Sequence, residues 1–248
     1  FLDLVCVGTA TQTEVKEQVD LMYSLIHQQV DAIVLVPIDS KALVQPVVEA
    51  VRKGVPVINI DIRLDTQLLE QAGVEVAFVG PDNFAAAYEV GKLLDKKLRN
   101  EDKVAIIEGL AAADNAQQRK RGFIKAIEEK GLRLVASEPA DWETEKAAEV
   151  FQAMWMRYPD LKAVYCSNDA MALGVLQQMQ EKNCYLPVVG FDNDAVMKEF
   201  LSTGKLVATA DIFSSQMAVR GIEFALDVLE GKIENRGVHS TAYEIIKQ

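Results

Sequence analysis

Polar side chains follow several short apolar runs of the chain, and their types suit a ligand rich in hydroxyl groups. Asp61 and Arg63 follow the run at residues 57–60, and Asn168 follows the run at residues 164–166. A polyol hydroxyl both donates and accepts, so a carboxylate can accept its hydrogen while Arg or Asn donates to its oxygen. The polar residues in such positions are Asp39, Asp61, Arg63, Asp82, Asn83, Asp114, Asn115, Ser167, Asn168, Asp169, Asp192, Asn193, Asp194 and Asp211.

Each of these residues also has a purely structural interpretation, because Asp or Asn after a strand commonly forms a turn or caps the next helix. That interpretation is favoured for Asp39, Asp82, Asn83, Asp169 and Asp194. Ligand binding is favoured for Asp61, Asn168 and Asp192. Trp142 lies in a polar loop between a predicted strand and a predicted helix, where it could be a lobe-packing residue or offer its ring to a ligand.

Residues that support catalysis are sparse. The only histidines, His27 and His239, have no cysteine or carboxylate neighbours at the spacing of a zinc site. The chain contains no Gly-x-Ser-x-Gly motif, and neither a Gly-x-Gly-x-x-Gly nor a Walker phosphate loop. We therefore expect a binding protein rather than an enzyme, with no metal and no cofactor.

Composition limits the partners that this chain can have. Its 248 residues carry a formal net charge of −11 at pH 7, which repels phosphate backbones and argues against nucleic acid as a partner. No apolar run approaches the roughly 20 residues that span a bilayer. Cys6, Cys166 and Cys184 are best interpreted as small hydrophobes, and a Cys166–Cys184 disulfide stays open for an oxidising compartment.

Apolar strands alternate with amphipathic helices along the chain, and this order predicts an α/β fold with doubly wound parallel sheets. The predicted strands are almost wholly apolar, as in parallel sheets covered on both faces. They span residues 30–36, 55–60, 104–107, 163–166 and 187–191. The predicted helices span residues 14–29, 40–53, 84–98, 117–130, 143–158, 170–182 and 213–230.

The alternation occurs twice, which predicts two similar lobes with a ligand cleft between the carboxyl ends of their strands. The predicted N-terminal lobe holds residues 1–80 and 213–241. The predicted C-terminal lobe holds residues 81–212 and 242–248. The three expected crossings between the lobes fall near residues 80–82, 211–213 and 240–243.

Several short motifs follow one another along the chain in a characteristic order and spacing. Asp61 ends the segment Gly-Val-Pro-Val-Ile-Asn-Ile-Asp, and Arg119 begins Arg-Lys-Arg-Gly-Phe. Asn168 lies in Ser-Asn-Asp-Ala-Met-Ala-Leu-Gly, and Asp192 ends Val-Val-Gly-Phe-Asp. Residues 204–209 read Gly-Lys-Leu-Val-Ala-Thr. In order and spacing, these motifs resemble those of periplasmic sugar-binding proteins of the ribose-receptor type, which have the type I periplasmic binding protein fold. The resemblance covers nearly the whole chain.

The resemblance implies a set of ligand-binding residues. Asp61, Arg119, Asn168 and Asp192 would hydrogen-bond a sugar, and Trp142 would pack against its ring. Arg63, Asn115 and Asp211 complete the predicted set. Ile62 stands where ribose receptors have arginine, and Ile212 stands beside Asp211 where they have glutamine. A different sugar, a sugar alcohol or a cyclitol therefore fits as well as ribose.

The resemblance also implies a role in transport. Such a protein delivers its ligand to the membrane subunits of an ABC permease, as a monomer in the periplasm or as a lipoprotein anchored outside the cell. A chemoreceptor is a further candidate partner. Two other classes stay open, the effector-binding core of a LacI-type repressor and a sugar-sensing receptor domain. The net negative charge and the segment at residues 204–209 favour the transport receptor.

The sequence begins inside an apolar run at Phe1 and contains no signal peptide, so we expect that a segment precedes it. Residues 1–7 match the second strand of the family's first lobe, in which the strand order is 2-1-3-4-5. About 25–35 residues that carry the first strand and helix, with ligand contacts of their own, are expected upstream. Pairing of residues 1–7 directly with residues 31–36 would contradict this register.

Overall fold

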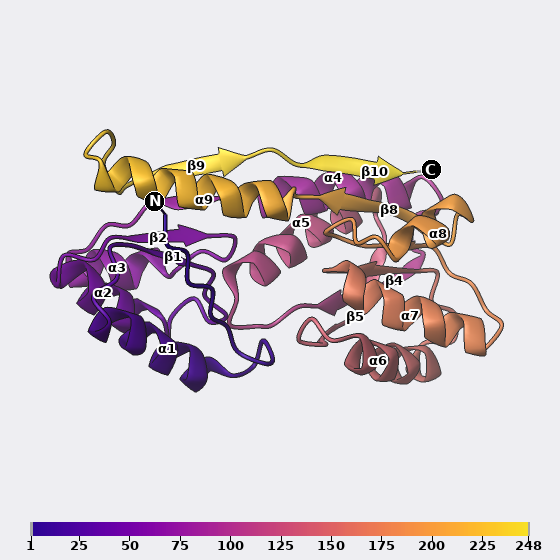
Figure 1. Ribbon diagram of the computed structural model, residues 1–248. Helices are drawn as coiled ribbons and strands as arrows, with labels where there is room; N and C mark the ends of the chain where they lie inside the picture. Colours follow the sequence, from indigo (N-terminus) through magenta and orange to yellow (C-terminus); the bar gives the residue numbers. More distant parts are fainter. Residues whose placement is uncertain (1, 248) are drawn as a thin grey trace. The chain divides into compact units, whose positions relative to one another are not determined.

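The computed structural model describes residues 2–247, and the chain divides into two compact units. Unit 1 comprises Phe1–Gly80, Ala112–Asp114 and Ser215–Ser240. Unit 2 comprises Pro81–Ala111, Asn115–Ser214 and Thr241–Gln248. Each unit is built on a sheet whose strands are connected through helices (Figure 1). The neighbouring strands are mostly parallel, so the predicted α/β class with parallel sheets is confirmed.

The sheet of unit 1 has the strand order β1-β2-β3-β9, and β2 pairs in parallel with both β1 and β3. Its elements, in chain order, are α1 (Val15–His27), β1 (Ile33–Leu35), α2 (Val44–Arg52), β2 (Val57–Ile60), α3 (Thr66–Ala72), β3 (Phe78–Pro81), α9 (Ser214–Leu229) and β9 (Val238–Thr241). Helix α9 is far from the others in sequence, yet it packs on this sheet, where Gly221 faces Ile60 and Val34.

Alternating side chains on β1 and β2 supply two separate apolar clusters in unit 1. Ile33, Leu35 and Val57 pack with residues of α1, α2 and α3. Ile58 and Ile60 pack with β3 and α9 instead. Successive side chains of a strand point to opposite faces, so this division means that helices cover both faces of the sheet. Continuous apolar runs such as residues 33–35 follow from that double burial.

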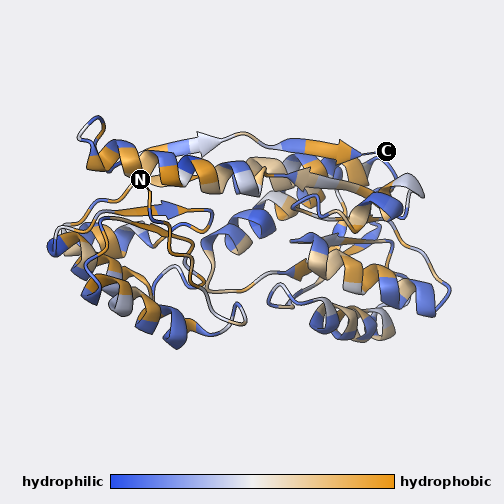
Figure 2. Cartoon of the chain, in the orientation of Figure 1, coloured by the Kyte–Doolittle hydropathy of each residue, from blue (hydrophilic) through white to orange (hydrophobic). Residues whose placement is uncertain are grey.

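The sheet of unit 2 has the strand order β10-β8-β7-β6-β4-β5, with β10 antiparallel to β8. Its elements, in chain order, are α4 (Asn83–Asp95), β4 (Lys103–Glu108), α5 (Asp114–Lys130), β5 (Arg133–Pro139), α6 (Thr144–Arg157), β6 (Ala163–Cys166), α7 (Asp169–Glu181), β7 (Val188–Val189), α8 (Met197–Ser202), β8 (Leu206–Asp211) and β10 (Glu244–Lys247). Helices α6 and α7 pack side by side (Figure 1), and each carries hydrophobic and hydrophilic residues, as Figure 2 shows.

The connections of unit 2 reverse direction at β4. This strand pairs with β5, which follows it in the chain, and with β6, which follows β5. Parallel crossovers are almost always right-handed, so α5 and α6 must cover opposite faces of the sheet. A crevice forms beyond the carboxyl ends of two strands where the order reverses, and ligands of open α/β sheets bind there. In unit 2 this point lies beyond β4 and β6.

Some expected elements differ from the structure. Residues 2–7 form no strand, so the predicted strand at residues 1–7 is wrong for every residue that the structure describes. In the described chain β1 pairs with β2 and not with residues 2–7. An apolar run becomes a strand only when another strand satisfies its backbone groups. The short helices α3 and α8, and the strands β9 and β10, were not predicted.

Within residues 2–247, no helix is long and apolar enough to cross a membrane. All three cysteines are free thiols: Cys166 is buried, Cys184 is partly buried and Cys6 is exposed. The open alternative of a Cys166–Cys184 disulfide is therefore not what the structure contains. The interpretation as a small buried hydrophobe holds for Cys166 and does not hold for Cys6.

Candidate functional site

Arg119 is the centre of a polar cluster in unit 2. Its side chain is only 3% exposed, and its Nε donates to Oδ1 of Asn83 at 2.9 Å. Its Nη1 donates to the backbone oxygen of Ser167 at 2.8 Å and lies 3.3 Å from Oδ1 of Asp192. The guanidinium therefore connects the start of α4, the end of β6 and the end of β7.

Two aromatic rings flank this guanidinium. Its Cζ lies 3.8 Å from the ring centroid of Phe191 and 5.5 Å from that of Trp142. A guanidinium is planar and weakly hydrated, so it can stack on aromatic rings while its edge donates hydrogen bonds. The Asp192 side chain is 29% exposed, so its carboxylate is held by Arg119 and still within reach of a ligand.

Asn168 follows β6 and begins α7. Its Oδ1 accepts a hydrogen bond from the backbone N–H of Met171 at 2.9 Å, which makes it the N-cap of the helix. Its amide nitrogen makes no hydrogen bond to another described residue, although the side chain is buried. Capping uses the oxygen alone, so the nitrogen can still donate to a ligand. The structural and the functional interpretation of Asn168 are therefore compatible.

Asn115 lies one helical turn before Arg119 on α5, so the two side chains share a helix face. Its Oδ1 is buried, and no donor among residues 2–247 reaches it. The Oγ of Ser167 is also buried and has no hydrogen-bond partner among residues 2–247. A buried polar atom without a partner is unfavourable, so both atoms indicate a place where a bound molecule supplies hydrogen bonds.

The turn after β7 carries Asp192 in a conformation that few residues adopt. Asp192 has a φ of 108° and Asn193 a φ of 59°. The Asn193 amide nitrogen donates to Oδ2 of Asp211 at 2.9 Å, and Oδ1 of Asp211 accepts from the backbone N–H of Phe213. Asp211 thus holds the turn that presents Asp192, and its own contact with a ligand stays a prediction.

Trp142 follows β5 and lies against Gly109, which follows β4. Its side chain is buried, and its backbone has a φ of 69°. A Cβ at Gly109 would lie 2.1 to 2.3 Å from three atoms of the indole ring. The absence of a side chain at Gly109 therefore lets the indole pack against the backbone just beyond β4. Of the two interpretations, packing within unit 2 is seen, and the role against a sugar ring stays a prediction.

Gly109→Ala is expected to displace the Trp142 indole and to destabilise the protein by about 1–3 kcal/mol, because the extra methyl group overpacks the site. Urea unfolding followed by circular dichroism measures this. In a Trp142→Ala background the same glycine substitution is expected to cost close to nothing, since the clashing ring is gone. An equal cost in both backgrounds would contradict the contact.

Asp61 and Arg63 belong to unit 1. Asp61 follows β2 with a φ of 61°, and its backbone N–H donates to the oxygen of Val79. The Cζ of Arg63 lies 5.5 Å from the ring centroid of Phe78. The expected convergence of Asp61 and Arg63 with the Arg119 cluster stays a prediction.

The structural interpretation is confirmed at two aspartates. Oδ1 of Asp39 accepts from the backbone N–H groups of Lys41 and Ala42, and Oδ1 of Asp82 caps α4. Asn83 instead anchors Arg119, a role that the sequence did not reveal. Phe191 was also missed, although its place directly before Asp192 could have indicated it.

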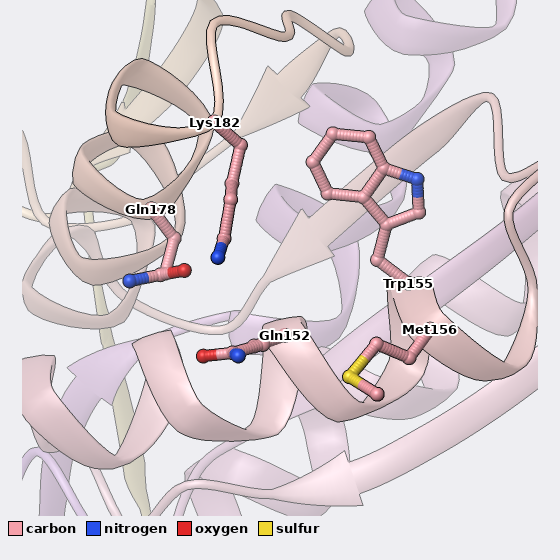
Figure 3. A pocket seen from close by; sticks show the side chains of 5 residues that line it. All are labelled: Gln152, Trp155, Met156, Gln178 and Lys182. Carbon is pink, nitrogen blue, oxygen red and sulfur yellow. The ribbon is translucent and has the colours of Figure 1, made fainter.

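A hollow in unit 2 lies between α6 and α7. It has a volume of about 360 Å³ and is lined by Gln152, Trp155, Met156, Gln178 and Lys182 (Figure 3). It contains none of the predicted ligand-binding residues and its wall is mainly apolar. We therefore place the candidate site at the Arg119 cluster.

Comparison with known proteins identifies the family of this chain. Residues 2–233 match the family described as the periplasmic binding protein domain, and the chain belongs to this family. The D-ribose/D-allose-binding protein of Pseudomonas aeruginosa is 41% identical over 98% of this chain and 78% of its own length. The D-allose-binding periplasmic protein of Escherichia coli is 33% identical over 89% of this chain and 72% of its own length.

Solved structures of ABC transporter solute-binding proteins are also similar to this chain. An ABC transporter solute-binding protein from Burkholderia multivorans superimposes with a TM-score of 0.94 at 40% identity, covering 99% of this chain and 87% of its own. One from Actinobacillus succinogenes with bound D-allose has a TM-score of 0.87 at 31% identity, covering 94% of this chain and 84% of its own. The resemblance to periplasmic sugar-binding proteins is confirmed.

Proposed function

We propose that this protein binds D-ribose, D-allose or a closely similar sugar and delivers it to an ABC permease. The observation that carries the proposal is the ion pair between the buried Arg119 and the partly exposed Asp192, at the carboxyl ends of the strands of unit 2. The 41% identity to a D-ribose/D-allose-binding protein supports the same class of ligand. The protein acts by binding and release and not as an enzyme, and it works in the periplasm.

The chemistry of the cluster suits a neutral sugar. The Asp192 carboxylate accepts hydrogen from a hydroxyl, while the Arg119 edge and the Asn168 amide nitrogen donate to hydroxyl oxygens. The unpartnered Oδ1 of Asn115 accepts one more hydrogen bond. Trp142 packs its ring on the C–H face of the sugar. A charged ligand is disfavoured because Arg119 and Asp192 already balance each other.

The second half of the site comes, in this proposal, from Asp61 and Arg63 of unit 1. The N-terminal lobe comprises residues 1–80 and 213–241, and the C-terminal lobe comprises residues 81–212 and 242–248. The two lobes close on the sugar by hinge motion and so present a closed, ligand-loaded surface to the permease. Arg63, displaced by one residue from the ribose-receptor pattern, adapts the site to its particular sugar.

Isothermal titration calorimetry with D-ribose, D-allose and D-fucose tests the proposal. At least one sugar is expected to bind with one site per chain, and Asp192→Ala is expected to weaken it by about 1.5–3 kcal/mol, or roughly 10- to 150-fold. The matched control is Asp160→Ala, which removes an exposed aspartate paired with Lys103 in the same unit. No binding of any sugar, or equal affinity in both variants, would contradict the assignment.

A further inference from the structure

Asp169 is a buried carboxylate that connects three segments of unit 2. It is the first residue of α7, and its side chain is inaccessible to solvent. Its Oδ2 accepts from the backbone N–H of Asp194 at 2.8 Å. The Thr209 hydroxyl on β8 lies 2.9 Å from Oδ1 and 3.0 Å from Oδ2. The sequence suggested a local turn or cap, whereas these partners lie 25 and 40 residues away.

These hydrogen bonds act on the turn that presents Asp192. The turn passes through two positive φ angles, at Asp192 and Asn193, and such a backbone persists only when its surroundings fix it. Besides the Asp169–Asp194 bond, Thr209 Oγ1 accepts from the Asn193 N–H at 3.2 Å. The Asp192 N–H donates to the oxygen of Ala210 at 2.7 Å. Asp169 and Thr209 therefore restrain both residues that follow Asp192.

The sequence also leaves room for this arrangement at Gly190. A Cβ at Gly190 would lie 2.0 Å from Oδ1 of Asp169. Only a residue without a side chain lets the carboxylate approach the strand that leads into the turn. The carboxylate is thus packed against the end of β7 as well as bonded to the turn and to β8.

We propose that Asp169 is a positioning residue that fixes the Asp192 turn for sugar binding, and that ionisation of Asp169 strengthens this binding. The proposal rests on the proposed function, since it acts through Asp192. The ionised carboxylate accepts from the Asp194 N–H and from the Thr209 hydroxyl at once. A protonated carboxyl is a weaker acceptor and must itself donate to Thr209, which loosens the turn.

The surroundings of Asp169 bring its pKa close to neutral pH. Burial raises the pKa of Asp169 to about 7, and the charge of Asp194 adds to the rise, while the hydrogen bonds from Asp194, Thr209 and Phe191 oppose it. The titratable groups that interact with it are Asp194 on the turn and Cys166 on β6. The other charged groups of this region are Asp192, which pairs with Arg119 on α5, and Asp211 on β8, which accepts from Asn193. Burial also raises the pKa of Asp194.

The test measures sugar affinity as a function of pH by calorimetry with D-ribose and D-allose. The wild-type association constant is expected to rise roughly 3- to 10-fold as the pH rises through about 7, the gain of a charge-assisted over a neutral hydrogen bond. Asp169→Asn has nearly the same shape and cannot ionise. Its affinity is expected to be independent of pH and equal to that of the wild type at low pH.

Two further variants separate positioning from stability. Asp194→Asn keeps the backbone donor and removes a like charge, so the pH step is expected to persist with a lower midpoint. Met154 is a buried residue on α6, so Met154→Ala lowers the stability of the protein. This variant is expected to keep the pH-dependent rise in affinity of the wild type. If the rise of affinity with pH persists in Asp169→Asn, or is absent from the wild type, the proposal is overturned. Failure of the wild type to bind either sugar overturns the proposed function itself.

Discussion

Arg119→Ala is expected to reduce sugar affinity at least 100-fold and to destabilise the protein by about 3–5 kcal/mol, because the buried acceptors on Asn83 and Ser167 lose their donor, at about 1–3 kcal/mol each. Three acceptors lose a donor at once: Oδ1 of Asn83, the backbone oxygen of Ser167 and the Asp192 carboxylate. The ring of Phe191 also loses the group stacked on it at 3.8 Å. Urea unfolding and calorimetry measure the two effects separately.

Arg121→Ala is the matched control, since Arg121 lies on the same helix and is exposed. It is expected to change stability by no more than about 0.5 kcal/mol and to leave affinity unchanged. Arg119→Lys keeps the charge and loses the planar, forked donor. Its sugar affinity and its stability are therefore expected to lie between those of the wild type and those of Arg119→Ala. If Arg119→Ala and Arg121→Ala behaved alike, the Arg119 cluster would not be the ligand site.

Gly174→Ala is expected to destabilise the protein by about 2–4 kcal/mol, because overpacking forces backbone shifts. Gly174 lies on α7, and a Cβ there would be 2.0 Å from the backbone oxygen of Thr144 and 3.2 Å from the nitrogen of Ala148, both on α6. A backbone oxygen cannot move aside as a side chain can, so the two helices must separate. Chemical unfolding of the variant measures the size and the sign of the change in the free energy of unfolding.

The sign of the change in stability of Gly174→Ala is informative, because alanine normally stabilises a helix relative to glycine by about 1 kcal/mol. Gly91→Ala on α4 is the matched control, where the Cβ would lie 3.1 Å from the Cβ of Ala126. That neighbour is the tip of a small side chain, so the change is expected to stay within about 1 kcal/mol of wild type. A stabilising Gly174→Ala would mean that α6 and α7 do not pack as closely as described.

The sequence alone determined the local structure and the side chains that could bind a polyol. Apolar runs such as residues 57–60 predicted strands buried on both faces, and the two clusters on opposite sides of β2 show why. The longer helices were predicted from their period, and Asp39 and Asp82 were correctly interpreted as local hydrogen-bond acceptors. Such features depend on residues a few positions apart, so their signal is contained in the sequence itself.

The tertiary structure decided which distant residues meet. The apolar run at residues 2–7 has the composition of a strand and forms none, because a strand needs a neighbour to take its hydrogen bonds. Arg119 contacts Asn83, Ser167 and Asp192 only because β6 pairs with β4 on the side opposite β5. The contacts of Asp169 with Thr209 and Asp194 likewise exist only once β6, β7 and β8 lie side by side. Strand order is set by long-range pairing and packing, which no local pattern encodes.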